Sequence, residues 1–165
     1  MLILALAVGG STAPGMAQSF FKNQPARLSV AVTAPEKAVA PGAHGAIILS
    51  VTPNPDIHVY APGNPDYIPV AVEMTPQAGL TFQPAAFPPG QDLLFGPLKT
   101  AVKVYSDPFD VRVPFTVKAA KGKASSAEPA TLTVHGTLSY QACNDKVCFP
   151  PQAAPFEATV TIGGR

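Results

Sequence analysis

Apolar residues recur at every second position in several separate stretches of this chain, and this pattern limits the possible folds more than any other feature. The clearest stretch is 109–117, FDVRVPFTV, in which polar residues or proline separate the apolar side chains. A period of two residues is typical of a β-strand with one face buried. Pro114 cannot donate a hydrogen bond to a neighbouring strand, so we expect this strand to lie at a sheet edge or to contain a bulge.

The rest of the chain predicts further short strands and no helix. Proline and glycine, with 20 and 13 residues, cluster between the apolar stretches, as is typical of turns that join strands. We therefore predict an all-β fold, an antiparallel β-sandwich of immunoglobulin-like type. The other stretches with strand character lie near 28–32, 47–51, 57–60, 70–74, 80–82, 101–105, 132–140 and 156–162.

Composition excludes several classes of protein. With 47% hydrophobic and 13% charged residues, the chain is typical of a folded domain rather than a disordered one. Its formal net charge is +1 and no basic stripe is visible, so we expect no nucleic-acid partner. No apolar stretch reaches the ~20 residues of a membrane helix, so we expect no membrane span in the mature chain.

The first residues have the pattern of an export signal. An apolar stretch at 2–8 is followed by GMA at 15–17, a small-x-small pattern, before Gln18. We expect residues 1–17 to be a signal peptide and residues 18–165 to form one exported domain. The alternative is that the apolar stretch forms a buried first strand.

The only two cysteines, Cys143 and Cys148, lie within SYQACNDKVCFPP at 139–151. The short turn between them can bring their Cα atoms into disulfide range, and outside the cytoplasm a disulfide is the simplest expectation. A loop this short adds little stability in the chain-entropy model, and exposed or strained disulfides are the ones that exchange. The pair is therefore either a structural disulfide that closes a turn or a site of thiol-disulfide exchange.

Other chemistries have weaker support in the sequence. A zinc site could combine the cysteines with His135, but structural zinc takes four ligands, and the other histidines, His44 and His58, stand far away in the sequence. A Ser-His-Asp hydrolase has no G-x-S-x-G segment here. We expect neither a metal nor a cofactor.

A loop bounded by proline and glycine is expected at 87–96, FPPGQDLLFG. It carries Leu93, Leu94 and Phe95 at its tip, and bulky apolar side chains on a loop need a surface to pack against. Either they fold under the loop as a satellite of the core, or they cover another feature of the molecule.

Several motifs resemble those of one protein family, the N-terminal periplasmic domains of the thiol:disulfide interchange protein DsbD. YQAC at 140–143 and CFPP at 148–151 are similar to the family's active-site segment, and DLLFG at 92–96 is similar to its cap loop. The segment 58–60, HVY, also resembles a family segment, and the similarity extends over most of 26–162.

This resemblance implies an immunoglobulin-like fold and a periplasmic thiol:disulfide oxidoreductase that transfers electrons through one cysteine pair. A membrane-embedded thiol transporter would reduce the pair, which would then reduce periplasmic thioredoxin-fold proteins, among them disulfide isomerases and cytochrome c maturation factors. By position, Cys148 would form the mixed disulfide with a partner and Cys143 would resolve it. The family continues into a membrane domain whereas this sequence ends at Arg165, so we expect the transporter on a separate chain.

The resemblance also implies which residues surround the pair. Leu94 and Phe95 would lie over it as a cap that excludes stray oxidants. Lys146 is the only cation in the turn and Asp145 stands beside it, so we expect no strongly acidic cysteine. If the disulfide is structural, the alternative function is an exported β-sandwich module for binding or assembly. The other residues implied around the site are Asp92, Gly96, Tyr140, Phe149 and Pro150.

Overall fold

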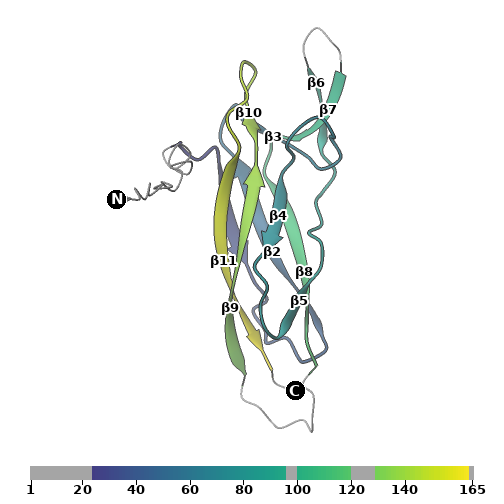
Figure 1. The fold of residues 1–165 in the computed structure, drawn as a ribbon, viewed down its shortest axis with the longest axis vertical. Helices are drawn as coiled ribbons and strands as arrows, with labels where there is room; N and C mark the ends of the chain where they lie inside the picture. The colour runs from purple at the N-terminus through teal and green to yellow at the C-terminus, as the bar shows by residue number, and fades with distance from the viewer. Residues whose placement is uncertain (1–23, 96–99, 120–128, 164–165) are drawn as a thin grey trace, which may run out of the picture.

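The computed structural model describes residues 24–95, 100–119 and 129–163, and within them the regular structure consists of strands β1 to β11 (Figure 1). No helix in this part of the chain has the length and apolarity needed to cross a membrane. The expected signal peptide lies outside the described residues. In chain order the strands are β1 Leu28–Thr33, β2 His44–Pro53, β3 His58–Tyr60, β4 Ala71–Met74, β5 Leu80–Phe82, β6 Gln91–Phe95, β7 Thr100–Tyr105, β8 Phe109–Val117, β9 Ala130–Tyr140, β10 Ala142–Cys143 and β11 Gln152–Ile162.

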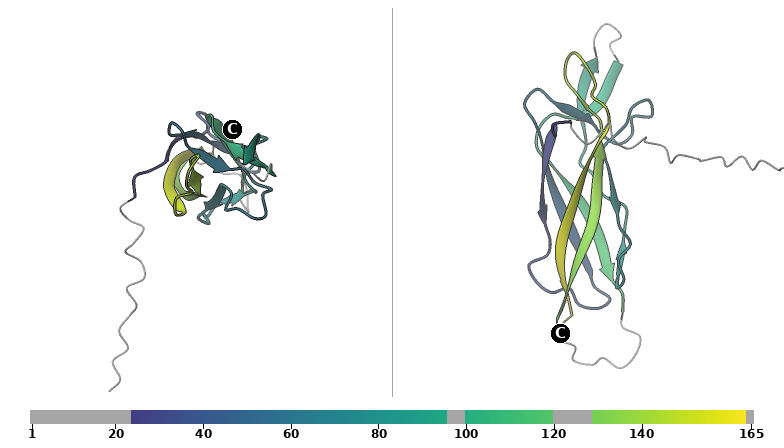
Figure 2. Two further views of the ribbon diagram at one scale, coloured as in Figure 1. Left: turned by 90° about the horizontal axis from the view of Figure 1, so that it is seen from above. Right: turned by 60° about the vertical axis from the view of Figure 1, so that its left-hand side comes forward.

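The strands form three antiparallel sheets. Two of them, with the orders β1-β2-β8-β5 and β11-β9-β4, face each other and make an elongated sandwich (Figures 1 and 2). The third sheet, with the order β10-β3-β7-β6, lies at one end of this sandwich, at the top of Figure 1. The predicted all-β, immunoglobulin-like sandwich is confirmed.

The core of the sandwich follows directly from the alternation in the sequence. Every second residue of β8 from Phe109 to Val117 is buried, and β2 contributes Ile47 and Leu49 to the same core. Each such side chain stabilises the fold by roughly 1.5–3 kcal/mol when it is fully buried. The Phe115 ring also lies against the backbone of β2, where a Cβ added at Gly45 would meet the ring at 2.4 Å. Small residues are therefore required opposite the largest ones.

The prediction that Pro114 lies at a sheet edge is wrong, because β8 lies between β2 and β5. The alternative, a bulge in β8, is not seen in its pairing with β2, whose register passes Pro114 without an extra residue. The proline fits because the pairing of β5 with β8 ends at Phe82. Just beyond, the Pro114 carbonyl accepts a hydrogen bond from the Gln83 nitrogen at 2.9 Å. The missing N–H of the proline therefore falls where this ladder stops.

The prediction of a loop over 87–96 is also wrong in part, because residues 91–95 form β6 and pair with β7 as a hairpin. The consecutive apolar residues conceal the alternation that would indicate a strand. In the structure Leu93 is half-buried, whereas Leu94 is 73% exposed. The expected loop therefore contains β6, one of the two outer strands of the small sheet.

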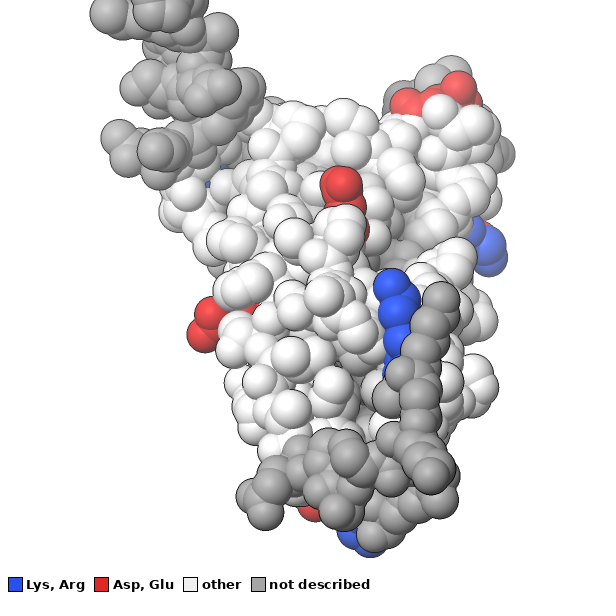
Figure 3. All heavy atoms as spheres, turned by 60° about the horizontal axis from the view of Figure 1, so that its bottom comes forward, with Lys and Arg blue, Asp and Glu red and all other residues white. Residues whose placement is uncertain are grey.

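Charged side chains are sparse on the face of the molecule shown in Figure 3. Lys and Arg side chains, in blue, are separated from one another there, and so are Asp and Glu side chains, in red. On this face the charges form no basic stripe of the kind that follows a nucleic-acid backbone.

Candidate functional site

Cys143 and Cys148 form a disulfide at the end of the molecule that carries the small sheet, with an S–S distance of 2.04 Å. Cys143 belongs to β10, which pairs with β3 so that Cys143 lies opposite His58. The two cysteines also face each other as an antiparallel bridge. The disulfide is therefore anchored on a sheet through Cys143, while Cys148 closes the turn that follows.

The turn between the cysteines is held by hydrogen bonds of its own. The Asn144 side-chain oxygen accepts from the backbone nitrogens of Lys146 and Val147 at 2.9 and 2.8 Å. The Asn144 nitrogen donates to the Val147 carbonyl at 2.9 Å, and the Phe149 nitrogen donates to the Ala142 carbonyl at 2.8 Å. Asn is favoured in turns because its side chain can replace a backbone acceptor. These contacts do not depend on the disulfide, so the turn can keep its shape when the disulfide is reduced.

The two sulfur-bearing residues differ sharply in exposure. Cys143 is 0% exposed and packs in a cluster with Tyr60, Val102 and Val104, hereafter the Cys143 cluster. Cys148 is exposed. Thiol-disulfide exchange requires a thiolate to reach one sulfur directly. An external thiol can therefore attack this disulfide at Cys148 and not at Cys143.

The Tyr60 hydroxyl lies between the two sulfurs. Its oxygen is 3.6 Å from Cys148 Sγ and 3.6 Å from Cys143 Sγ. A disulfide sulfur carries no proton, so the hydroxyl is the donor in both contacts. The Tyr60 ring stacks on Tyr67, with ring centroids 4.3 Å apart and an interplanar angle of 24°. Burial raises the pKa of Tyr60, and the neighbouring Tyr67 adds to this shift, so the hydroxyl stays protonated at neutral pH.

The surroundings of the pair carry little charge. His58 is buried, and burial lowers its pKa, although the Asp145 carboxylate opposes this shift. An imidazole with a pKa below its usual 6.5 is neutral at pH 7. The charged residues of the turn, Asp145 and Lys146, are exposed. The structure therefore surrounds the buried sulfur with neutral groups.

The residues that flank the cysteine pair in the sequence contact Arg27 and Gln152. Tyr140 is buried. Its hydroxyl donates to Gln152 Oε1 at 2.8 Å and accepts from the backbone nitrogen of Arg27 at 3.3 Å. The Arg27 guanidinium stacks over the half-buried Phe149 ring, 3.7 Å from the ring centroid. Pro150 is exposed. These contacts fix the backbone that enters and leaves the turn.

The hairpin of β6 and β7 carries the two residues that the family resemblance assigns to the cap, Leu94 and Phe95. Asp92 forms an exposed ion pair with Lys103 across the hairpin at 2.7 Å. Leu94 is 73% exposed, whereas Leu93 packs against the Cys143 cluster. Gly96 and the side chain of Phe95 lie outside the described residues.

Three residues at the site were not among those expected there, namely Tyr60, Tyr67 and Leu93. The first is in the HVY segment, and its position is set by pairing between β3 and β10, whose residues are more than eighty positions apart. Sequence spacing gives no register for such a pairing. The signal for Tyr60 in the sequence was the resemblance of the HVY segment at 58–60 to a family segment.

The zinc alternative lacks ligands in the structure. Among residues 24–95, 100–119 and 129–163, no group of three His, Cys, Asp or Glu side chains lies close enough together to hold a metal ion. His135 lies on β9, opposite Glu157 of β11. The histidine that approaches the cysteines is His58, on β3.

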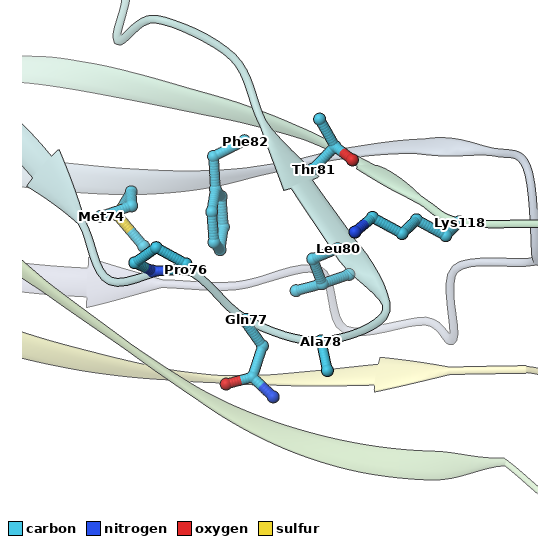
Figure 4. A pocket seen from close by; sticks show the side chains of 8 residues that line it. All are labelled: Met74, Pro76, Gln77, Ala78, Leu80, Thr81, Phe82 and Lys118. Atoms are coloured by element: carbon cyan, nitrogen blue, oxygen red, sulfur yellow. The ribbon is translucent and has the colours of Figure 1, made fainter.

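Two surface hollows lie elsewhere on the sandwich. One is formed by His135, Pro155, Phe156 and Glu157. The other, shown in Figure 4, is an open groove around β5, where the Lys118 side chain runs toward Leu80 and Thr81. Neither hollow is lined by a cysteine.

A family model described as thiol:disulfide interchange protein DsbD, N-terminal, matches residues 29–159. No curated protein matches the chain. The matched region is most of the chain and includes both cysteines, β3 and the β6–β7 hairpin.

Proposed function

This chain belongs to the family of N-terminal domains of the thiol:disulfide interchange protein DsbD, and from this membership we propose that it relays electrons through the Cys143–Cys148 pair. The donor is a membrane-embedded thiol transporter, the acceptors are thioredoxin-fold proteins, and the compartment is the periplasm. The observation that supports this most is the contrast between the exposed Cys148 and the fully buried Cys143. A structural disulfide needs no such asymmetry, whereas a relay needs one sulfur within reach of its partners.

The asymmetry supports a definite order of events. A thiolate of the donor attacks Cys148, the Cys143–Cys148 bond breaks, and Cys143 leaves as a thiolate. A second donor thiolate then attacks the donor's own sulfur in the mixed disulfide and releases Cys148. The reduced pair repeats the same steps in reverse on an oxidised acceptor. Cys148 thus forms each mixed disulfide; the donor's second thiolate resolves the one with the donor, and Cys143 resolves the one with the acceptor.

The apolar surface around the site supports a protein partner. Among the described residues, the exposed large hydrophobic side chains are Ile68, Leu94 and Val147. In the sequence, Val147 precedes Cys148, Ile68 follows Tyr67 and Leu94 follows Leu93. Tyr67 and Leu93 both pack against the Cys143 cluster. Each of the three is a sequence neighbour of a site residue, and exposed apolar groups are typical of surfaces that dock another protein.

Direct electron transfer tests this proposal. We expect the reduced domain to reduce an oxidised thioredoxin-fold disulfide isomerase on the order of tenfold faster than it reduces oxidised glutathione at equal disulfide concentration, a difference of about 1.4 kcal/mol in activation free energy. Stopped samples are alkylated and the free thiols of both proteins are counted by mass spectrometry. Equal rates with the protein and with glutathione would contradict a partner-specific relay.

Leu93 should shield the reduced pair from small oxidants. We expect Leu93→Ala to increase the rate at which hydrogen peroxide oxidises the dithiol by about threefold or more, because the side chain packs on the Cys143 cluster. Leu94→Ala is the matched control, since Leu94 is 73% exposed and its loss uncovers little. Phe95→Ala, at the position that the family resemblance assigns to the cap, is expected to act like Leu93→Ala. Identical oxidation rates in all three variants and the wild type would remove the shielding role.

A further inference from the structure

The hydroxyl of Tyr60 has a position that the relay alone does not require. The residue is 1% exposed, yet its hydroxyl points at both sulfurs at 3.6 Å. Within the described part of the chain, the Tyr60 hydroxyl is the side-chain group that donates a hydrogen bond to each of the two sulfurs. A buried hydroxyl normally finds a stronger acceptor than sulfur, such as a carbonyl oxygen. Tyr105 illustrates this, because its hydroxyl donates to the Pro88 carbonyl at 2.6 Å.

Exchange at this disulfide produces a negative charge in an unfavourable place. When a thiolate attacks Cys148, the electron pair of the broken S–S bond stays on Cys143, which is 0% exposed. A buried thiolate loses its hydration, and this raises the barrier unless a donor replaces the water. His58, opposite Cys143 in the strand pairing, is neutral at pH 7 and supplies no cation. The group already positioned to donate is the Tyr60 hydroxyl.

We propose that Tyr60 is a catalytic residue of thiol-disulfide exchange, whose hydroxyl donates a hydrogen bond to the cysteine sulfur that leaves. The inference rests on the exchange reaction of the proposed function. In the first step the partner–Cys148 bond forms, the Cys143–Cys148 bond breaks, and the hydroxyl donates to the Cys143 thiolate. In the second step the partner's second thiolate forms the partner's own disulfide and expels Cys148 as a thiolate. The same hydroxyl, 3.6 Å from that sulfur also, donates to it, and the two protons of the partner dithiol end on the two cysteines by way of solvent.

The proton stays on the Tyr60 oxygen throughout these steps. Burial raises the pKa of Tyr60 above its ordinary value of 10.0, whereas an unperturbed thiol has a pKa near 8.5. By these ordinary values a phenol is a weaker acid than a thiol, so the Tyr60 hydroxyl stabilises the thiolate without giving up its proton. Such a donor works in both directions of electron flow, because it favours whichever sulfur carries charge.

The position of Tyr60 is fixed from several sides, as a preorganised donor requires. Its backbone lies in β3 opposite Val104 of β7, and its carbonyl accepts from the Val70 nitrogen at 2.8 Å. Tyr67 stacks on one face of its ring, and His58 meets it edge-on with ring centroids 6.0 Å apart. The hydroxyl therefore needs no rearrangement when charge develops on sulfur.

Removal of this single hydroxyl tests the inference. We expect Tyr60→Phe to slow reduction of the domain by dithiothreitol about tenfold, the effect of losing one hydrogen bond to a charged group. The pH profile of alkylation of the reduced domain by iodoacetamide should also shift to higher pH, because the thiolate loses its donor. Tyr105→Phe is the matched control, since it removes a buried hydroxyl of the same sheet that is bonded to a carbonyl; its rate and profile should match the wild type.

Unchanged reduction rate and alkylation profile in a folded Tyr60→Phe domain would overturn the inference. If that variant does not fold, the wild-type domain labelled with ¹³C at tyrosine Cζ gives the answer. The Tyr60 resonance should then titrate with the cysteine thiols, and a resonance that ignores their ionisation would overturn the inference equally. Dithiothreitol needs no protein partner, so failure of the relay with thioredoxin-fold proteins leaves this result unaffected, and the reverse also holds.

Discussion

Cys148→Ser is expected to abolish capture of a thioredoxin-fold partner, whereas Cys143→Ser should accumulate the captured complex as a mixed disulfide. The reason is the difference in exposure, because Cys148 is exposed and Cys143 is 0% exposed. With Cys143 alone, the thiol is enclosed by Tyr60, Val102 and Val104 and no partner sulfur can approach it. With Cys148 alone, attack succeeds and nothing on this chain remains to release the partner.

A partner with a single active-site cysteine, activated as its thionitrobenzoate disulfide, makes the two variants directly comparable. Attack by this chain releases the coloured thionitrobenzoate, and a non-reducing gel shows whether the mixed disulfide persists. The wild type should release the dye and then the partner. Cys143→Ser should release the dye and keep the partner as a mixed disulfide. Cys148→Ser should neither release the dye nor form a mixed disulfide. The variant that lacks both cysteines is the blank. Capture by Cys148→Ser but not by Cys143→Ser would reverse the roles of the two residues.

Local pattern was sufficient for most of the fold. The alternation at 109–117 identified β8, and the weaker alternations identified strands in the other sheets, since burial of one face has a direct signature in sequence. The errors came where neighbours decide the structure. Pro114 fits in an interior strand only because β5 ends beside it, and Leu93 to Phe95 form a strand only because β7 pairs with them.

The site, like the fold, has features that local sequence predicts and features that only long-range contacts determine. The disulfide could be expected from the short spacing of the cysteines and the predicted export signal, and the family resemblance supplied their roles as a prediction. Tyr60 and Tyr67 come to the site through long-range strand pairing and the stacking of two rings. Such contacts leave no periodic trace, because register between distant strands depends on the whole sheet.

The Cys143–Cys148 couple is expected to have a reduction potential between roughly −180 and −270 mV, the range of exchange proteins. Three features favour this range over that of a structural bridge. Cys148 is exposed, and exposed disulfides have the higher potentials. The closed loop is short, so cross-linking stabilises the fold by only about 2 kcal/mol in the chain-entropy model. The hydrogen bonds of Asn144 hold the turn without the disulfide.

Equilibration of the domain with dithiothreitol or glutathione buffers, followed by alkylation and mass spectrometry, measures this potential. A value below about −300 mV would indicate a structural bridge and favour an exported module for binding or assembly. The two ranges differ by at least about 30 mV, or roughly 1.4 kcal/mol for a two-electron couple. The Tyr60→Phe variant distinguishes an effect on the reduction potential from an effect on the exchange rate. An ordinary thiol, with a pKa near 8.5, is largely protonated near neutral pH, so we expect loss of a thiolate donor to slow the exchange while moving the potential little.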